Sequence, residues 1–345
     1  MFPITEHVLR TDRHTSFYLA CGAAEAPLLI FVHGWPELST SWRHQLPVFA
    51  ALGYRCIAPD MRGYGRSSLY PRHADYALEH SVRDMLDLLD SLARPKAIWV
   101  GHDWGSPVVW SLASHHPDRC HGIATLCVPY IPEGFAPANT IGLADRRVYE
   151  EATFPAAQWD YQLFYEENFD AARTAFEVNV GDTVKALFRK GSKAGKGQPA
   201  RTATIRRDGG WFGGTGKAPA VPRDADVLTE ADVLTEADLA AYVASLERNG
   251  FFGPDSWYMN HERNIDYAAR AQNGGRITLP VLFLHGAYDY VCETVDSRLA
   301  EPMRAFCSDL TEVVVESGHW MAQENPVAVN AALSRFLATK LAGAG

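Results

Sequence analysis

The stretch that most constrains the fold is Val100–Gly105, Val-Gly-His-Asp-Trp-Gly. It follows an apolar run at 96–100, typical of a buried strand, and precedes apolar residues at helical spacing, Val108, Val109, Leu112 and Ala113. So sharp a turn between strand and helix strains the backbone of Asp103, and only residues without a Cβ fit two positions to either side. The stretch predicts a carboxylate displayed at a sheet edge, beside the positive end of a helix. The simpler interpretation is an aspartate that caps a helix, and only the rest of the chain can decide between the two.

Strand-like and helix-like segments alternate on both sides of this turn. A hairpin is expected over 8–19, further strands over 27–32, 54–58, 122–128, 279–286 and 310–315, and helices near 295–305 and 326–341. Continuously apolar runs such as 27–32 indicate strands buried on both faces. The alternation predicts an α/β fold with a mostly parallel, eight-stranded sheet and right-handed connections.

The alternation stops between 130 and 271, where helical segments and loops appear without a convincing buried strand. We therefore expect a core formed by 1–129 and 272–345, with 130–271 inserted as a helical cap. Such a cap would lie over the carboxyl ends of the strands, where open α/β sheets keep their sites.

Two parts of the cap look non-catalytic. Residues 189–222 are rich in Gly, Lys, Arg and Ala and predict a long flexible loop. Its basic residues could meet an acidic ligand, but a solvated loop is the simpler interpretation. Asp226–Ala231 is repeated at once as Asp232–Ala237, a local duplication that lengthens a loop, after which Thr235 and Asp238 predict a helix capping box.

Charge and cysteine usage restrict the partners and the location. The 345 residues carry a net charge of -9, which disfavours nucleic acid as a partner. The six cysteines show no CxxC or metal-type spacing and predict buried thiols in a reducing compartment. No signal segment and no membrane-spanning apolar run are found, so we expect a cytoplasmic location and no membrane contact. The oligomeric state is left open.

A carboxylate nucleophile needs a base for water, an acid to orient that base, and donors for an oxyanion. His319 follows the last expected strand and Asp289 follows the strand before it. The order nucleophile, acid, histidine is that of α/β-hydrolases. Glu37 is a lower-ranked rival to Asp289, and three other histidines at strand ends are interpreted as structural, His33, His102 and His285.

The residue types also restrict the chemistry. The backbone N–H groups of Trp35 and Trp104 are the candidate oxyanion donors, each worth roughly 10²–10³ in rate. Asp103 is ionised at neutral pH, so His319 is free to activate water. Carboxylate attack on a carbonyl gives an unproductive anhydride, whereas attack on an sp³ carbon gives an ester that water can cleave. Epoxides and haloalkanes are the two substrate classes that remain.

Six motifs carry a resemblance that covers nearly the whole chain: His33–Glu37, Met61–Gly65, Gly101–Gly105, Asp160–Leu163, Gly253–Asn264 and Gly318–Trp320. The sequence resembles the α/β-hydrolase-fold epoxide hydrolases, in particular the hydrolase half of soluble epoxide hydrolase. The resemblance implies that Tyr161 and Tyr258 hold and protonate the epoxide oxygen, with Tyr165, one helical turn on, as the alternative to Tyr161. It also implies that Trp104 lines the pocket, which Pro36 and Gln162 are expected to border.

The resemblance has limits. No phosphatase half precedes the hydrolase, so no metal-dependent activity is expected, and the 189–222 loop and the duplicated hexapeptide have no clear counterpart. We expect a hydrolase that converts small-molecule epoxides to vicinal diols without cofactor or metal, through an ester on Asp103 that is cleaved by water activated by His319. The alternatives are a haloalkane dehalogenase with the same nucleophile and a catalytically silent small-molecule receptor.

Overall fold

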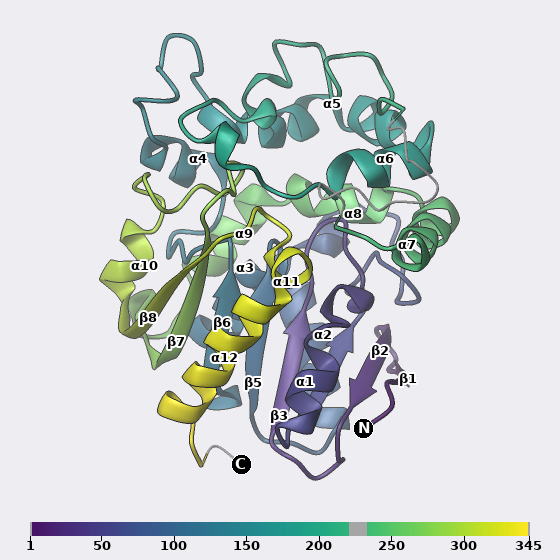
Figure 1. Ribbon diagram of the computed structural model, residues 1–345, viewed down its shortest axis with the longest axis vertical. Coiled ribbons are helices and arrows are strands. Elements are labelled where there is room, and N and C mark those ends of the chain that lie inside the picture. Colours follow the sequence, from purple (N-terminus) through teal and green to yellow (C-terminus); the bar gives the residue numbers. More distant parts are fainter. Residues whose placement is uncertain (1, 221–232, 344–345) are drawn as a thin grey trace.

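The structure, a computed structural model, describes residues 2–220 and 233–343 (Figure 1). Eight strands form one sheet in the order β1-β2-β4-β3-β5-β6-β7-β8. Their bounds are β1 Thr5–Arg10, β2 Thr15–Cys21, β3 Leu28–Val32, β4 Arg55–Pro59, β5 Ala97–His102, β6 Cys120–Leu126, β7 Ile277–Gly286 and β8 Cys307–Val315. β2 pairs antiparallel with β1 and β4, and the other neighbours pair in parallel. The predicted α/β-hydrolase fold with a mostly parallel eight-stranded sheet is confirmed.

The core helices are α1 Leu46–Ala51, α2 Leu78–Ser91, α3 Gly105–His115, α10 Glu301–Phe306, α11 Met321–Glu324 and α12 Pro326–Lys340. The helix predicted over 295–305 begins only at Glu301. The Glu293 carboxylate accepts hydrogen bonds from the backbone N–H groups of Val295, Asp296 and Ser297, which fixes a turn there instead.

Helices α4 Pro137–Thr140, α5 Asp160–Glu177, α6 Val180–Leu187, α7 Glu236–Asn249, α8 Phe252–Ser256 and α9 His261–Ala268 lie between β6 and β7 in the chain. Figure 1 shows most of them gathered above the carboxyl ends of the strands. The capping box predicted from Thr235 and Asp238 begins α7. The exact cap boundaries, 130 and 271, stay a prediction, and the first copy of the duplicated hexapeptide lies outside the described residues.

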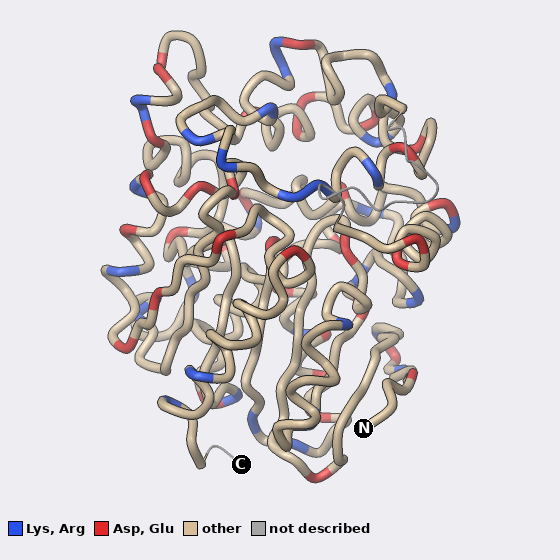
Figure 2. The backbone as a smooth tube through the Cα atoms, in the orientation of Figure 1, with Lys and Arg blue, Asp and Glu red and all other residues tan. Residues whose placement is uncertain are grey.

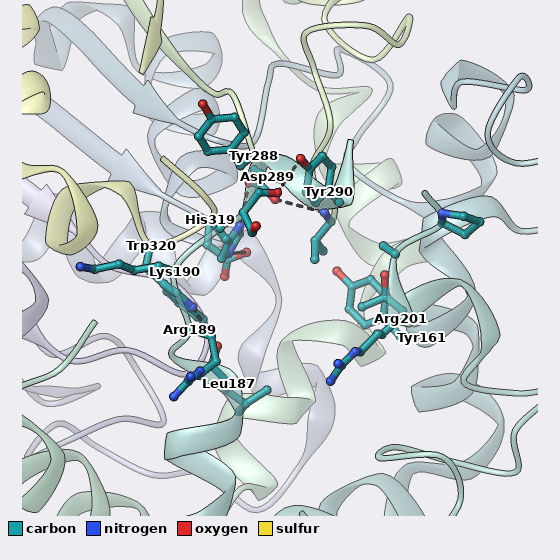
Figure 3. A pocket seen from close by; sticks show the side chains of 18 of the residues that line it. Tyr161, Leu187, Arg189, Lys190, Arg201, Tyr288, Asp289, Tyr290, His319 and Trp320 are labelled. Atoms are coloured by element: carbon teal, nitrogen blue, oxygen red, sulfur yellow. Dashed lines mark hydrogen bonds and ion pairs between the residues drawn. The ribbon is translucent and has the colours of Figure 1, made fainter. Parts of the chain in front are cut away.

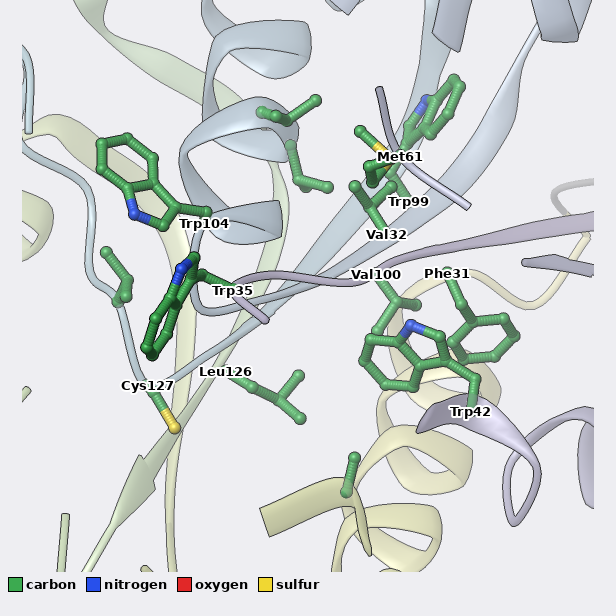
Figure 4. Packing of buried hydrophobic residues seen from close by; sticks show 14 of the residues in the cluster. Phe31, Val32, Trp35, Trp42, Met61, Trp99, Val100, Trp104, Leu126 and Cys127 are labelled. Carbon is green, nitrogen blue, oxygen red and sulfur yellow. The ribbon is translucent and has the colours of Figure 1, made fainter. Parts of the chain in front are cut away.

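The core is built on the central strands. Figure 4 shows Phe31 and Val100 packed beside Trp42, and Val32 beside Met61 and Trp99. Trp35 and Trp104 lie near the strand ends. The residues of β3 and β5 are all buried, as their continuous apolar runs predict. All six cysteines are buried and free. Among the described residues, no helix combines the length and apolar character needed to cross a bilayer.

Candidate active site

The turn after β5 has the predicted geometry. Asp103 has a φ of 47°, in the left-handed region that favours glycine. A Cβ on Gly105 would overlap the carbonyl oxygen of Val32, and one on Gly101 would approach the carbonyl of Gly105. The two glycines therefore allow a sharp turn between β5 and α3. In this turn, two residues before α3 begins, Asp103 is held in a strained backbone conformation.

The carboxylate of Asp103 is held from two sides. Its Oδ1 accepts a hydrogen bond of 2.7 Å from the backbone N–H of Trp35, and its Oδ2 lies 3.5 Å from Nε2 of His319. Nδ1 of His319 lies 2.9 Å from Oδ2 of Asp289. The other oxygen of Asp289 accepts from the backbone N–H groups of Val291 and Cys292, at 3.1 and 3.0 Å. The structure thus brings together the predicted nucleophile, the predicted histidine and acid, and one of the two predicted oxyanion donors.

The pKa values of His319 and Asp289 depend on each other. Burial alone would lower the pKa of His319, but the negative charge of Asp289 and hydrogen bonds to Asp103 and Asp289 raise it well above its ordinary value. Burial alone would raise the pKa of Asp289, whereas the charge and hydrogen bond of His319 hold it below its ordinary value. The neighbouring acids Asp103 and Asp289 therefore favour the protonated form of His319.

Glu37, the rival acid, lies elsewhere. Its Oε2 is 2.7 Å from Nδ1 of His102 and accepts a hydrogen bond of 3.0 Å from the N–H of Gly34. Nε2 of His102 in turn lies 2.7 Å from the carbonyl oxygen of His319. Despite burial, His102 lowers the pKa of Glu37 to about 2, and Glu37 raises that of His102 well above its ordinary value. The two form a buried ion pair that connects the loops carrying the oxyanion donor, the nucleophile and His319.

The other two strand-end histidines are engaged within the core, as predicted. Nε2 of His33 accepts from the N–H of Met61 at 2.9 Å, and His285 lies between Thr294 and Glu312 at 2.8 and 3.0 Å.

Two tyrosines of the cap line the cavity that contains Asp103, the predicted nucleophile. Tyr161 on α5 and Tyr258, in the turn after α8, line the same cavity as Asp103, and their rings are 5.6 Å apart at 74°. Burial, followed by the nearby Tyr161 and Asp103, raises the pKa of Tyr258 well above its ordinary value. Burial does the same for the pKa of Tyr161. Both phenols are therefore protonated donors at neutral pH.

Tyr165 is placed differently. Its ring stacks on Tyr258 at 4.5 Å, and its hydroxyl lies 3.4 Å from a carboxyl oxygen of Asp255. It is fully buried and lies behind the cavity surface that Tyr161 and Tyr258 form. The contacts favour Tyr161 over Tyr165 as the partner of Tyr258.

The cavity has a volume of about 510 Å³. Its lining includes the polar residues Asp103, Asp289 and His319 and the apolar residues Trp35, Leu187, Trp211 and Trp320. Figure 3 shows Asp289, His319 and Trp320 grouped on one side of the cavity. Residues 187–202 form a large part of the lining. The prediction that 189–222 is only a solvated loop is therefore wrong for its described part. Trp211 explains why, because it packs on Trp35 and Tyr161 at 6.3 and 5.8 Å and draws this segment onto the site.

Trp104, predicted to line the pocket, and Pro36 and Gln162, predicted to border it, are not among the lining residues of the cavity and are buried behind them. Trp104 packs edge-on against Tyr258 at 5.2 Å, and its backbone N–H, in the turn after Asp103, stays a predicted oxyanion donor. The amide Nε2 of Gln162 donates to the hydroxyl of Tyr161 at 3.1 Å. Pro36 is buried next to Trp35.

Asp255 is a site residue that the sequence did not reveal. It is fully buried, and its Oδ1 accepts a hydrogen bond of 2.9 Å from the indole N–H of Trp35. Burial raises the pKa of Asp255 well above its ordinary value, so a neutral carboxyl holds the indole in place. The residue follows Gly253-Pro254 within one of the resemblance motifs, but nothing in its spacing distinguishes it from a surface acid.

One group of metal-type donors exists among the described residues. Ligand atoms of His102, Cys127 and His319 lie within 4.8 Å of one another. They are already engaged, since His102 bonds Glu37 and the carbonyl of His319, and His319 bonds Asp289. This donor set does not fit a resident metal ion.

Comparison with known proteins places this geometry in a family. The family model of the alpha/beta hydrolase fold matches residues 27–326. Epoxide hydrolase A of Mycobacterium tuberculosis is 34% identical over 337 residues, covering 96% of this chain and 97% of that protein. The chain belongs to the α/β-hydrolase fold family, and within it to the epoxide hydrolases.

Two further comparisons agree with this assignment. Bifunctional epoxide hydrolase 2 of Sus scrofa is 31% identical over 314 residues, and the chain spans about half of it, 52%, as it does with the corresponding proteins of Rattus norvegicus and Mus musculus. The crystal structure of epoxide hydrolase A from Mycobacterium thermoresistibile superposes with a TM-score of 0.77 at 31% identity, covering 98% of this chain and 99% of that one.

Proposed function

We propose that this chain hydrolyses small-molecule epoxides to vicinal diols through a covalent ester on Asp103. One observation carries the proposal: the side chains of Tyr161, Tyr258 and Asp103 line a single cavity, and burial raises the pKa of each phenol above its ordinary value. An epoxide opens to an alkoxide, which needs proton donors on one side of the ring and a nucleophile on the other. The names of the relatives support the same substrate class.

In the first half-reaction, Tyr161 and Tyr258 donate hydrogen bonds to the oxirane oxygen while an oxygen of Asp103 attacks a ring carbon from the far side. The carbon–oxygen bond of the ring breaks, the new ester bond forms, and the alkoxide takes a proton from a tyrosine. The hydrogen bond from Gln162 occupies a lone pair of the Tyr161 oxygen, which leaves its proton available to the substrate.

In the second half-reaction the charge of Asp103 has gone. One of the two carboxylates that raise the pKa of His319 is then a neutral ester, so this pKa falls and His319 gives up its proton, which replaces the one that the tyrosine lost to the alkoxide. The neutral imidazole, oriented by Asp289, takes a proton from water, which attacks the side-chain carbonyl of Asp103. The N–H groups of Trp35 and Trp104 stabilise the oxyanion. When it collapses, the ester bond between the Asp103 carbonyl carbon and the substrate oxygen breaks, His319 gives its proton to that oxygen, and the diol leaves. The new carboxyl group of Asp103 then returns a proton to His319, which restores the resting site.

The two alternatives fit less well. A haloalkane dehalogenase needs N–H donors, usually indoles, for the departing halide. Of the two tryptophans near the tyrosines in the lining, Trp35 has its indole N–H bonded to Asp255, which leaves that of Trp211 as a single donor. The tyrosine hydroxyls supply the proton that an alkoxide requires and a halide does not. A silent receptor would not need the complete arrangement of Asp103, Asp289 and His319.

The test compares Tyr161→Phe, Tyr258→Phe and the double variant with Tyr165→Phe as the matched control. The double variant should lose about 10²–10⁴-fold in kcat/KM for styrene oxide, because positioned acids contribute that much. Tyr165→Phe removes a hydroxyl bonded to Asp255 and should stay within about threefold of wild type. Diol formation that survives the double change would contradict the role given to the tyrosines. Bromide release from 1-bromobutane that is faster than diol formation from styrene oxide would support the dehalogenase.

A further inference from the structure

The cap segment 187–196 lies against both loops that carry the predicted base and its acid. It begins at the end of α6, and Figure 2 shows its basic residues crossing the molecule where the cap helices meet the strand ends. Arg189 and Lys190 line the cavity, and Figure 3 shows them near His319 and Trp320. A segment of the cap that lines the cavity thus also adjoins the predicted base.

One oxygen atom joins this segment to the loop of His319. Oε1 of Glu324 accepts the backbone N–H of Gly318 at 2.8 Å and that of Gly191 at 3.1 Å. The two glycines touch, since a Cβ added to Gly191 would lie 2.4 Å from the Cα of Gly318. Residues with a side chain could not approach so closely, so these glycines put the cap and the histidine loop in direct backbone contact.

The residue after His319 is bonded to the same segment. The indole N–H of Trp320 donates a hydrogen bond of 2.9 Å to the carbonyl oxygen of Leu187, and its ring stacks on Phe188 at 4.2 Å and 24°. Stacked aromatic pairs contribute about 0.5–1.5 kcal/mol beyond the area that they bury. His319 is therefore held on both sides by contacts between its chain neighbours and the cap.

The loop of Asp289 is bonded to this segment as well. The hydroxyl of Tyr290 donates to the carbonyl oxygen of Ser192 at 2.9 Å, and a Cβ added to Gly195 would lie 2.4 Å from the Tyr290 ring. The segment thus contacts the chain neighbours of both members of the pair formed by His319 and Asp289, in which Nδ1 and Oδ2 are 2.9 Å apart. A shift of the segment would therefore move this pair relative to the predicted nucleophile.

We propose that Glu324 is a positioning residue for the second half-reaction, because it ties the cap segment to the loop of His319. In that step Nε2 of His319 takes a proton from a water that must also reach the carbonyl carbon of the ester on Asp103. A displacement of about 1 Å can slow such a step about 10²-fold. Attack of Asp103 on the epoxide does not use His319 as a base and depends far less on Glu324. The inference rests on the proposed epoxide hydrolysis and adds a residue to it.

The contact needs an accepting oxygen on residue 324 and does not need its charge. Burial raises the pKa of Glu324, whereas its hydrogen bonds with Gly318 and Gly191 and the charge of Lys190 act in the opposite direction. Oε2 of Glu324 is buried and has no hydrogen-bond partner among the described residues. Oε1 can accept in either protonation state. Glutamine keeps such an oxygen and alanine does not, so the two substitutions separate the hydrogen bonds from the charge.

The test compares Glu324→Ala with Glu324→Gln by stopped-flow tryptophan fluorescence with styrene oxide. Glu324→Ala should slow hydrolysis of the ester about 10-fold to 100-fold and change the rate of its formation by less than about threefold. Glu324→Gln should restore most of the rate of hydrolysis. Glu316→Ala, at an exposed acid of the same loop, is the control and should behave as wild type.

Gly191→Ala tests the contact from the cap side and leaves Glu324 in place. The added Cβ would overlap Gly318, so the segment must shift, and hydrolysis of the ester should again slow more than its formation. Gly142→Ala is the control in the cap, since its Cβ meets nothing within 4 Å. Equal slowing of both steps, or unchanged rate constants, in Glu324→Ala and Gly191→Ala would overturn the inference, because a contact that only stabilises the fold predicts those results.

A measurement without substrate separates failure of this inference from failure of the proposed function. The imidazole of His319 can be titrated by NMR in histidine-labelled protein and assigned by its absence from His319→Gln. Against the effect of burial, contacts with Asp289, Asp103 and Cys127 raise its pKa, so Glu324→Ala should lower this pKa and Glu324→Gln should not. An unchanged pKa in Glu324→Ala would overturn the inference. A lowered pKa in a protein that opens no epoxide would support the positioning and contradict the proposed function.

Discussion

Changing Asp289 to Asn should separate the two half-reactions, because the surroundings of this side chain dictate how an amide must sit. One carboxylate oxygen accepts two backbone N–H groups and the other faces Nδ1 of His319. An amide can replace only one of these oxygens with another acceptor. Its oxygen must stay with the two N–H donors, so its NH₂ group must face His319.

The expected slowing of ester hydrolysis follows from these contacts. Turning the amide round would lose two hydrogen bonds of about 1.5 kcal/mol each, so the turned form is disfavoured by about 3 kcal/mol, or about 100-fold to 200-fold. In the favoured form Nδ1 of His319 must accept, and Nε2 carries the proton and cannot take one from water. Loss of the negative charge beside the imidazolium adds to this. Hydrolysis of the ester should slow by about 10²–10⁴-fold, while attack by Asp103 should be affected far less.

Stopped-flow tryptophan fluorescence with an aryl epoxide provides the assay, since Trp35 and Trp211 line the cavity. The variant should show a burst of one equivalent of alkylated protein, followed by slow diol formation. Asp309→Asn, at an exposed acid paired with Lys340, is the control and should behave as wild type. Equal slowing of both phases in Asp289→Asn would refute the reasoning, because the residue would then only hold the fold.

Two further predictions concern stability. The pKa of Glu37 is lowered from 4.5 to about 2, so Glu37 contributes stability that is present above about pH 4.5 and is lost as the pH falls toward about 2. In urea unfolding, the free energy of unfolding of the wild type should fall by about 3 kcal/mol more than that of Glu37→Gln across this pH range, in which His102 stays protonated. The same pH dependence of the free energy of unfolding in both proteins would contradict the ion pair. Gly105→Ala should cost about 3 kcal/mol or prevent folding, because its Cβ would overlap the carbonyl of Val32, whereas Gly142→Ala meets nothing within 4 Å; equal stability of the two variants would contradict the strained turn.

Much of the fold and of the catalytic arrangement could be predicted because local sequence determines it. The turn at Asp103 needs glycines at fixed positions, and buried parallel strands appear as continuous apolar runs. Topology then brings the residues after β7 and β8, Asp289 and His319, to the same edge of the sheet as Asp103. The order of the strands along the chain was therefore enough to predict that these residues lie close together.

The two features that the sequence did not predict, the role of segment 189–222 and that of Asp255, depend on tertiary contacts. The composition of 189–222 predicts a solvated loop, yet Trp211 packs onto Trp35 and Tyr161 and brings the segment into the cavity lining. Asp255 resembles a surface acid in sequence, and only the fold buries it beneath the indole of Trp35. Such roles arise from the packing of the cap on the core, which periodicity and turn chemistry do not encode.

The central claim, a covalent ester on Asp103, is tested most directly by His319→Gln. The variant keeps Asp103, Tyr161 and Tyr258 and loses the group that activates water. After incubation with an epoxide and proteolysis, mass spectrometry should find the peptide that carries Asp103 heavier by the mass of one substrate molecule. An unmodified peptide, in a variant that still consumes epoxide, would contradict the two-step mechanism.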